Sequence, residues 1–262
     1  MPPIRSSLGT ATLVALLAGS SGCWNQPTSQ PPLETDAREI RTFETLRTMD
    51  FKSVHQAFAM LGNSSYTARV EVEERDRNAD VVARSVGVFD VPRSGTIVPT
   101  EDLPGSGEFS EGFLSFLLGS REQDRLGRLS EQLLSTSPPF ADLKLREQFS
   151  YASPRDTTIH GAEASLHVAR AVVPSSVQPV RQARIAATRS DSAIVYVRID
   201  RHDDSIFYEE LSTLEITLVE SESGLLPVTK RFDVSVDVPF EPLRQFTMIE
   251  SFQLRSHEAS GG

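Results

Sequence analysis

Residues 66–91, YTARVEVEERDRNADVVARSVGVFDV, decide the fold of this chain. In the first part of the stretch, apolar side chains alternate with polar ones, which is the period of a β-strand with one wet face. A second strand-like run covers 82–91, and the sequence DRNAD at 76–80 between the two runs favours a turn. The stretch therefore predicts an antiparallel β-hairpin with one apolar face and one charged face.

The segment before this hairpin has the spacing of an amphipathic helix. Its apolar residues recur three or four positions apart, at Ile40, Phe43, Leu46, Phe51, Val54, Phe58 and Leu61. Asp36 followed by Glu39 resembles a capping-box start, and the Gly-Asn pair at 62–63 supplies a stop. We predict one amphipathic helix between these signals and leave open a break near residues 49–50.

The β pattern returns in the second half of the chain. Candidate strands cover 149–153, 164–173, 193–200, 214–220, 228–238 and 245–254. Leucines at helical spacing predict a helical insertion at 122–134. Because the later strands follow one another without alternating helices, they should pair antiparallel. The predicted fold class is α+β: a curved antiparallel β-sheet with an N-terminal amphipathic helix and a helical insertion, in a single domain over 37–255.

The first residues have the features of an export leader. Arg5 gives it a positive start, residues 8–19 form an apolar stretch of 12, and small residues follow. Twelve residues are too few for a membrane-spanning helix, which needs about 20. We predict a signal peptide over 1–22.

Cys23, the only cysteine of the chain, comes directly after this leader. The sequence LLAGSSGC at 16–23 resembles the cleavage site of bacterial lipoproteins, although Ser20 stands where a leucine is usual. That resemblance implies that the chain is cleaved just before Cys23, which becomes the first residue of the mature protein and is acylated. The alternative is ordinary secretory cleavage, which would leave Cys23 as a free thiol on a flexible end.

Residues 23–36 should act as a tether between anchor and domain. Proline, glutamine, serine and threonine dominate them, and this composition favours extended, hydrated backbone. Trp24 stands where an aspartate would resemble an inner-membrane retention signal. We therefore expect a protein of the bacterial cell envelope, anchored to the outer membrane and facing the periplasm. Residues 256–262 are expected to form a disordered tail.

Composition restricts the possible partners. The formal net charge is −10, and the 26 lysines and arginines are dispersed among 36 carboxylates. Nucleic acid binding requires clustered positive charge to displace counterions, so nucleic acid is excluded as a partner. The membrane, through the lipid anchor, and a lipid or another envelope protein are the partners that remain, and no cofactor is expected.

The motifs of common enzymes are absent from the sequence. It contains no GxSxG or HExxH, and no serine stands three residues before a lysine. The neighbouring carboxylates Glu71, Glu73 and Glu74, and the pair at 209–210, fit charged strand faces and turns better than a hydrolytic pair. We predict no catalytic residues and no enzymatic activity.

The nearest approach to a metal site is Asp200, His202 and Asp204. Their alternate spacing resembles the opening of a calcium-binding loop. The loop lacks its glycine, where Ser205 stands, and its closing glutamate, where Leu211 stands. We therefore predict a hydrated hairpin turn here and no metal site.

The order of helix, hairpin, helical insertion and antiparallel strands resembles the LolA and LolB lipoprotein carriers and the sensor domain of RseB. The resemblance rests on 51–72, on the turn at 159–161 that leads into 166–173, and on 224–227 leading into a long strand. In that family a curved sheet wraps a helix and encloses an apolar cavity for acyl chains. The resemblance implies a groove lined by Phe113, Leu114, Phe116, Leu117 and Leu118. Ordinary core packing is the competing explanation of the same run.

Two functions therefore follow from the sequence. The first is a non-enzymatic envelope lipoprotein that holds a lipid or lipoprotein acyl chain in an apolar groove. The second is a structural or sensing lipoprotein whose sheet surface engages another envelope protein. A dry cavity would favour the first, whereas a packed interior with an exposed apolar patch would favour the second.

Overall fold

The hairpin predicted at 66–91 is present in the computed structural model, which describes residues 37–94, 96–109, 134–173, 179–204, 209–221, 224–237 and 243–255. Strand β1 (Tyr66–Arg75) pairs antiparallel with β2 (Val81–Val91). In the turn between them, Asp76 Oδ1 accepts hydrogen bonds from the backbone N–H groups of Asn78 (2.9 Å) and Asp80 (3.1 Å). The turn is therefore closed by the acidic residue that the sequence placed there.

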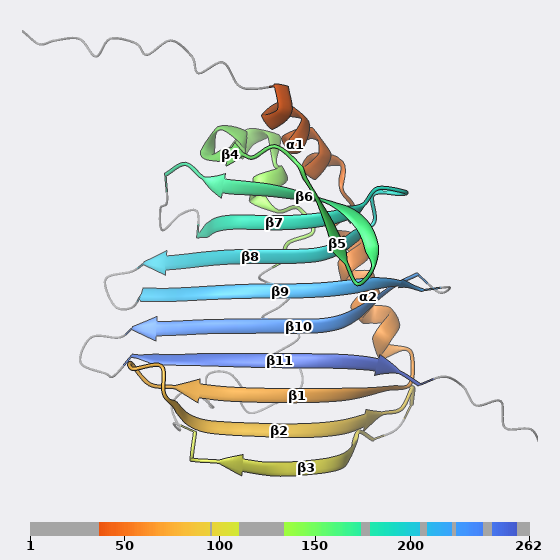
Figure 1. Ribbon diagram of the computed structural model, residues 1–262, viewed down its shortest axis with the longest axis vertical. Helices are drawn as coiled ribbons and strands as arrows, with labels where there is room; N and C mark the ends of the chain where they lie inside the picture. Colours follow the sequence, from red (N-terminus) through yellow and green to blue (C-terminus); the bar gives the residue numbers. More distant parts are fainter. Residues whose placement is uncertain are drawn as a thin grey trace, which may run out of the picture. The chain divides into compact units, whose positions relative to one another are not determined.

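All eleven described strands join one antiparallel sheet, which confirms the α+β class with a curved open sheet (Figure 1). The strands after the hairpin are β3 (Val98–Ser106), β4 (Phe149–Tyr151), β5 (Arg155–Ile159), β6 (Ala162–Ala171), β7 (Val180–Thr188), β8 (Ile194–Asp204), β9 (Glu209–Ser221), β10 (Gly224–Asp237) and β11 (Arg244–Leu254). Their order is β3-β2-β1-β11-β10-β9-β8-β7-β6-β4, and β5 also pairs with β6. The last strand therefore lies beside the first.

Three strands were not predicted from the sequence. Strand β3 contains Pro99 and Pro104, which lack the N–H group that a ladder needs, and the strand accordingly lies at the sheet edge. Strand β5 is the polar sequence RDTTI, and its turn to β6 uses His160 and Gly161, both with positive φ (46° and 84°). Strand β7 has alanine at half of its buried positions, so its apolar signal is weak.

Two helices precede the sheet, and the break left open near residues 49–50 is real. Helix α1 (Ala37–Thr48) and helix α2 (Lys52–Gly62) are separated where Asp50 Oδ1 accepts a hydrogen bond from the Lys52 N–H (3.0 Å). Helix α2 ends at the predicted Gly-Asn stop. The proposed cap Asp36 lies outside the described residues. No helix in the described ranges is long and apolar enough to cross a membrane.

The core lies between these helices and one face of the sheet. Phe43 of α1 and Phe51, which precedes α2, are buried, as is Phe140 in the short 3₁₀ helix η1 (Pro139–Ala141). The Phe140 ring meets Phe51 edge to face at 5.7 Å, and Tyr151 Oη donates a hydrogen bond to the Phe140 carbonyl (3.0 Å). A second 3₁₀ helix, η2 (Leu143–Gln148), leads into β4. The sheet and both helices belong to one compact unit, Thr35–Gly262.

Several predictions concern segments outside the described ranges. The helical insertion at 122–134 lies outside them except for Leu134, which is buried in the core. The leader, the tether and the tail at 256–262 also lie outside. These assignments stay predictions.

His167 on β6 makes stability depend on pH. Its side chain is buried, and burial lowers the pKa of His167 below its usual value. In the unfolded chain the imidazole takes up a proton below about pH 6.5, whereas the folded chain resists it, so stability is lost as pH falls from there toward the lowered pKa. We expect the urea midpoint of the His167→Leu variant to fall less than that of the wild type between about pH 7.5 and about pH 5.

The exposed His160 in the β5–β6 turn provides the control. The His160→Asn variant, whose new side chain tolerates positive φ, should keep the pH dependence of the wild type. If the urea midpoints of the wild type and of His167→Leu fell equally over this pH range, the pH dependence could not be assigned to His167.

Candidate functional site

The two faces of the sheet differ in chemistry because side chains alternate along each strand. The face that we call the inner face carries Phe232, Val234, Phe246 and Met248, all buried in the core with the helices. Helix α2 packs on β10, and helix α1 packs on β4 and β6. The described helices therefore cover the sheet between β4 and β10.

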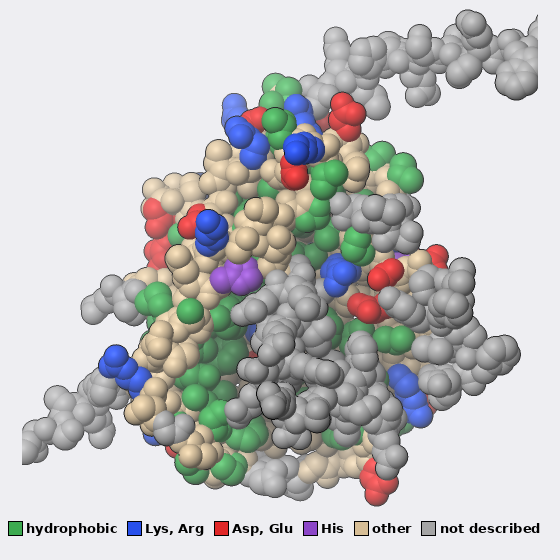
Figure 2. Space-filling model, turned by 180° about the vertical axis from the view of Figure 1, so that it is seen from behind, with side chains coloured by type: hydrophobic (Ala, Val, Ile, Leu, Met, Phe, Trp, Pro, Cys, Tyr) green, Lys and Arg blue, Asp and Glu red, His purple; other side chains and the backbone are tan. Residues whose placement is uncertain are grey.

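On β1, β2 and β11 the inner face continues as a half-buried apolar surface, which we call the apolar strip. Its members are Val70, Val72, Phe89 and Phe252, joined by Tyr66 and by Phe58 of α2. Phe252 meets both Phe58 and Tyr66 edge to face, with centroids 6.1 Å apart in each pair. Figure 2 shows hydrophobic side chains gathered on the face behind the view of Figure 1. The strip is less buried than the core that it continues.

Gly87 on β2 shapes one end of the strip. A Cβ atom at this position would lie 2.7 Å from two atoms of the Phe89 ring. The absence of a side chain therefore lets the Phe89 ring lie over the backbone of its own strand. The register places Val70 opposite Gly87, so the ring lies beside the apolar residues of β1.

Two ion pairs interrupt this inner face. Lys230 Nζ lies 2.7 Å from Glu250 Oε2, with side chains 7% and 18% exposed. Arg244 Nη1 lies 3.3 Å from Glu74 Oε1, and the Glu74 side chain is only 1% exposed. The expectation that Glu74 belongs to a charged strand face was therefore wrong. Its place in the alternation of β1 puts it on the inner face, in register with Phe246.

The sequence contains a signal for these two ion pairs. Lys230, Glu250 and Glu74 each occupy an apolar phase of an alternating strand, so they break the pattern that predicted those strands. Tyr66 lies in the same environment. Burial, together with the neighbouring Glu250 carboxylate, raises the pKa of Tyr66, so its phenol stays protonated at neutral pH.

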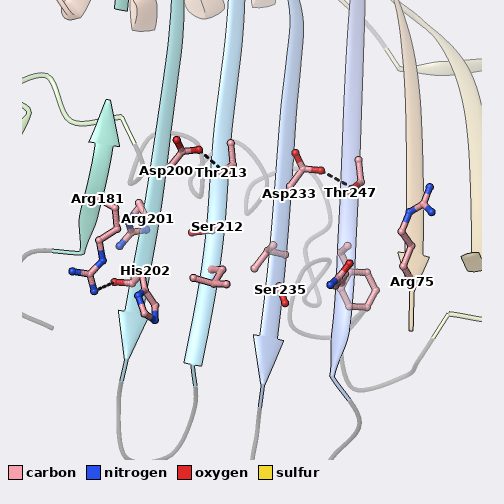
Figure 3. Close-up of a pocket in the computed structure, with 14 residues that line it drawn as sticks. Arg75, Arg181, Asp200, Arg201, His202, Ser212, Thr213, Asp233, Ser235 and Thr247 are labelled. Atoms are coloured by element: carbon pink, nitrogen blue, oxygen red, sulfur yellow. Dashed lines mark hydrogen bonds between the residues drawn. The ribbon is translucent and has the colours of Figure 1, made fainter. Parts of the chain in front are cut away.

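The opposite, outer face is polar and forms an open depression of about 450 Å³ over β8–β11 (Figure 3). One cross-strand row contains Asp200, Thr213, Asp233 and Thr247. Thr213 donates to Asp200 (2.9 Å) and Thr247 donates to Asp233 (2.6 Å). The next row along the strands consists of His202, Leu211, Ser235, Gln245 and Arg75.

Asp200, His202 and Asp204 do not form the predicted turn, because β8 continues through Asp204. Asp200 accepts hydrogen bonds from Arg198 Nε (3.0 Å) and Thr213, and His202 Nε2 lies 2.9 Å from Glu209 Oε1. Within the described ranges, no three His, Cys, Asp or Glu side chains are grouped to hold a metal ion. The three residues therefore lie on one strand, and two of them are engaged with other partners.

The depression does not show the pairing of a hydrolytic nucleophile with its base. Thr213 donates a hydrogen bond to Asp200, and Ser212, which precedes it on β9, is in register with Val234 and so lies on the inner face. His202 Nε2 lies 2.9 Å from Glu209 Oε1, so His202 is directed to this carboxylate and not to the Thr213 hydroxyl.

The site residues predicted from the sequence are not among those that the structure describes. Cys23 and the apolar run Phe113, Leu114, Phe116, Leu117 and Leu118 are outside the described residues. The apolar strip was only partly anticipated: the apolar phase of β1 was predicted, whereas its contact with β11 depends on a pairing between the two ends of the folded region.

Comparisons with known proteins give likenesses of fold only. No protein-family model matches the sequence, and no curated protein matches it. One similar solved structure is a DUF1329 family protein from Desulfovibrio piger, with 6% identity and a TM-score of 0.27 over 85% of this chain and 94% of that one. Another is a LolA superfamily protein from Nitrosomonas europaea, with 10% identity and a TM-score of 0.24 over 83% and 94%. A third is a putative outer membrane lipoprotein-sorting protein domain from Vibrio parahaemolyticus, with 8% identity and a TM-score of 0.27 over 79% and 93%.

Proposed function

We propose that this chain is a non-enzymatic protein of the bacterial cell envelope that binds the acyl chain of a lipid or lipoprotein along its apolar strip. The proposal rests on a difference in burial between two parts of the same sheet face. The inner face is tightly packed where the helices cover it, and the same face continues on β1, β2 and β11 as half-buried apolar and aromatic side chains. Covering such surface releases about 25 cal/mol per Å² of apolar area.

The dimensions of the strip suit an extended chain. From Tyr66 to Val72 the strand rises by about 3.3 Å per residue, which gives a path of about 20 Å along β1. The aromatic rings of Phe58, Phe252 and Phe89 lie beside this path. We further propose that acyl groups on Cys23 hold the protein at the outer membrane. The apolar run at 113–118 would supply a further wall of the groove.

The experiment is a titration of a fluorescent fatty-acyl probe against purified protein. Wild-type protein should bind the probe at micromolar concentration. Because each substitution exchanges apolar contact area for a hydroxyl, Val72→Ser and Phe89→Ser should each weaken binding by about tenfold or more.

The matched control is Leu211→Ser, which removes an exposed apolar side chain from the outer face. Its affinity should equal that of the wild type. Absence of probe binding by the wild type would contradict the acyl-chain function and favour engagement of a partner protein. Equal losses in all three variants would show that the probe does not occupy the strip.

A further inference from the structure

Two phenylalanines border the apolar strip, and a small residue lies between them. Phe89 of β2 and Phe252 of β11 are both in register with Ala68 of β1, the strand between those two. Residues of one cross-strand row have their side chains on the same face of the sheet. Ala68 is only 7% exposed. It is therefore the low floor of a groove whose walls are the two taller aromatic side chains.

The two aromatic rings are staggered along this groove. The Phe252 ring meets the Tyr66 ring edge to face, with centroids 6.1 Å apart. The Phe89 ring extends the other way along β1, because two of its atoms lie 2.7 Å from where a Cβ atom of Gly87 would be. Gly87 is opposite Val70. The ring on the β2 side therefore flanks Val70, whereas the ring on the β11 side is turned toward Tyr66.

Gly87 allows the Phe89 ring to take this position. A separation of 2.7 Å is well below the 3.5–4.0 Å, or about that, at which carbon atoms make favourable contact. Any side chain at position 87 would therefore displace the ring. The displaced atoms are the far end of a flexible side chain, so the ring can move while the backbone stays in place. The residue at position 87 thus sets the position of one wall without deciding the fold.

The strand spacing limits what the groove can hold. Strands β2 and β11 are the two neighbours of β1, so their backbones lie about 10 Å apart at about 4.8 Å per spacing. An acyl chain that touches both walls at about 3.5–4.0 Å needs about 7–8 Å between wall atoms. Two chains side by side would need about 11–12 Å by the same contact distances. The groove therefore fits one chain and not two.

We propose that Gly87 determines the specificity of the apolar strip. By letting the Phe89 ring lie over β2, it leaves a groove that accepts one unbranched acyl chain between Phe89 and Phe252. This inference rests on the acyl-chain function proposed above and adds the class of ligand, a single straight chain. A methyl branch on the chain would need space that the two walls occupy.

The first test is Gly87→Ala in the titration with the fluorescent fatty-acyl probe. This substitution adds apolar area, yet it should weaken binding by about threefold or more because it displaces the Phe89 ring. The urea midpoint should equal or exceed that of the wild type, since alanine in a strand costs less conformational entropy than glycine. Weaker binding would then not result from unfolding.

Two further variants complete this test. In a Phe89→Ala background, Gly87→Ala should have no further effect on affinity, because the ring that it displaces is absent. The matched control is Gly62→Ala at the end of α2, where an added Cβ atom would meet nothing within 4 Å. The affinity of this control for the probe should equal that of the wild type.

The second test compares how a straight-chain fatty acid and a methyl-branched isomer with the same number of carbon atoms displace the probe. Wild-type protein should prefer the straight chain by about tenfold, and Phe89→Ala should reduce this preference because one wall is lost. Equal affinity of the wild type for both isomers, or a Gly87→Ala affinity equal to the wild type, would overturn the specificity inference and leave the acyl-chain function standing. If the wild type binds neither isomer, the acyl-chain function fails, and the specificity inference fails with it.

Discussion

Truncation of Phe140 to alanine is expected to lower the free energy of unfolding by about 3–5 kcal/mol. The ring is 0% exposed, and it meets Phe51 at 5.7 Å and Phe149 at 6.5 Å. It therefore links the region before α2 to the first strand after η2. The loss should appear as a lower urea midpoint with an unchanged m-value.

Phe252→Ala removes the same side chain from the half-buried strip and serves as the control. Because the Phe252 ring is partly exposed in the native state, its removal should cost clearly less than that of Phe140. Equal losses would mean that the strip is as tightly packed as the core. That result would also weaken the acyl-chain proposal, since a packed wall has no surface to offer.

Replacement of Glu250 by leucine is expected to cost about 3–5 kcal/mol, because it leaves Lys230 charged and buried without its anion. The Lys230 side chain is only 7% exposed and its ammonium group lies 2.7 Å from the Glu250 carboxylate. Adding Lys230→Met to Glu250→Leu should restore most of the lost stability, because two apolar side chains need no partners. A double-mutant cycle measured by urea denaturation gives the coupling.

An exposed pair provides the comparison for this cycle. Arg47 and Glu44 on α1 are also 2.7 Å apart, but both side chains are about half exposed. Glu44→Ala should change stability by less than about 1 kcal/mol. If Glu250→Leu were equally mild, Lys230 would have access to water and the inner face would be wetter than the structure indicates.

Local signals in the sequence predicted the local structure well. Alternation predicted β1 and β2, and the acidic turn residues predicted the connection between them. Helical spacing predicted one amphipathic helix over the range of α1 and α2 and left the break between them open. In each case the residues that make the element also stabilise it. Strand β3 was missed because its prolines argue against a strand, and only its position at the sheet edge makes them tolerable.

The candidate sites depend on pairings that the sequence does not encode locally. The apolar strip requires β1 to lie beside β11, and the depression requires side chains from β8 to β11 to line up in rows. The wrong prediction for Glu74 has a simpler cause. Glu71 and Glu73, shortly before it in the sequence, suggested a solvent-exposed face, whereas the two-residue period of the strand places Glu74 on the inner face.

The pairing of β1 with β11 also determines when the protein can fold. Tyr66 lies opposite Leu254, and Arg255 donates a hydrogen bond to Thr67, which is 188 residues away. During synthesis, the hairpin leaves the ribosome long before its neighbour in the sheet exists, and until β11 arrives both β1 and β10 present open edges. Closing so long a loop is slow, so the growing chain must be protected from strand pairing with other molecules until its last strand has been made.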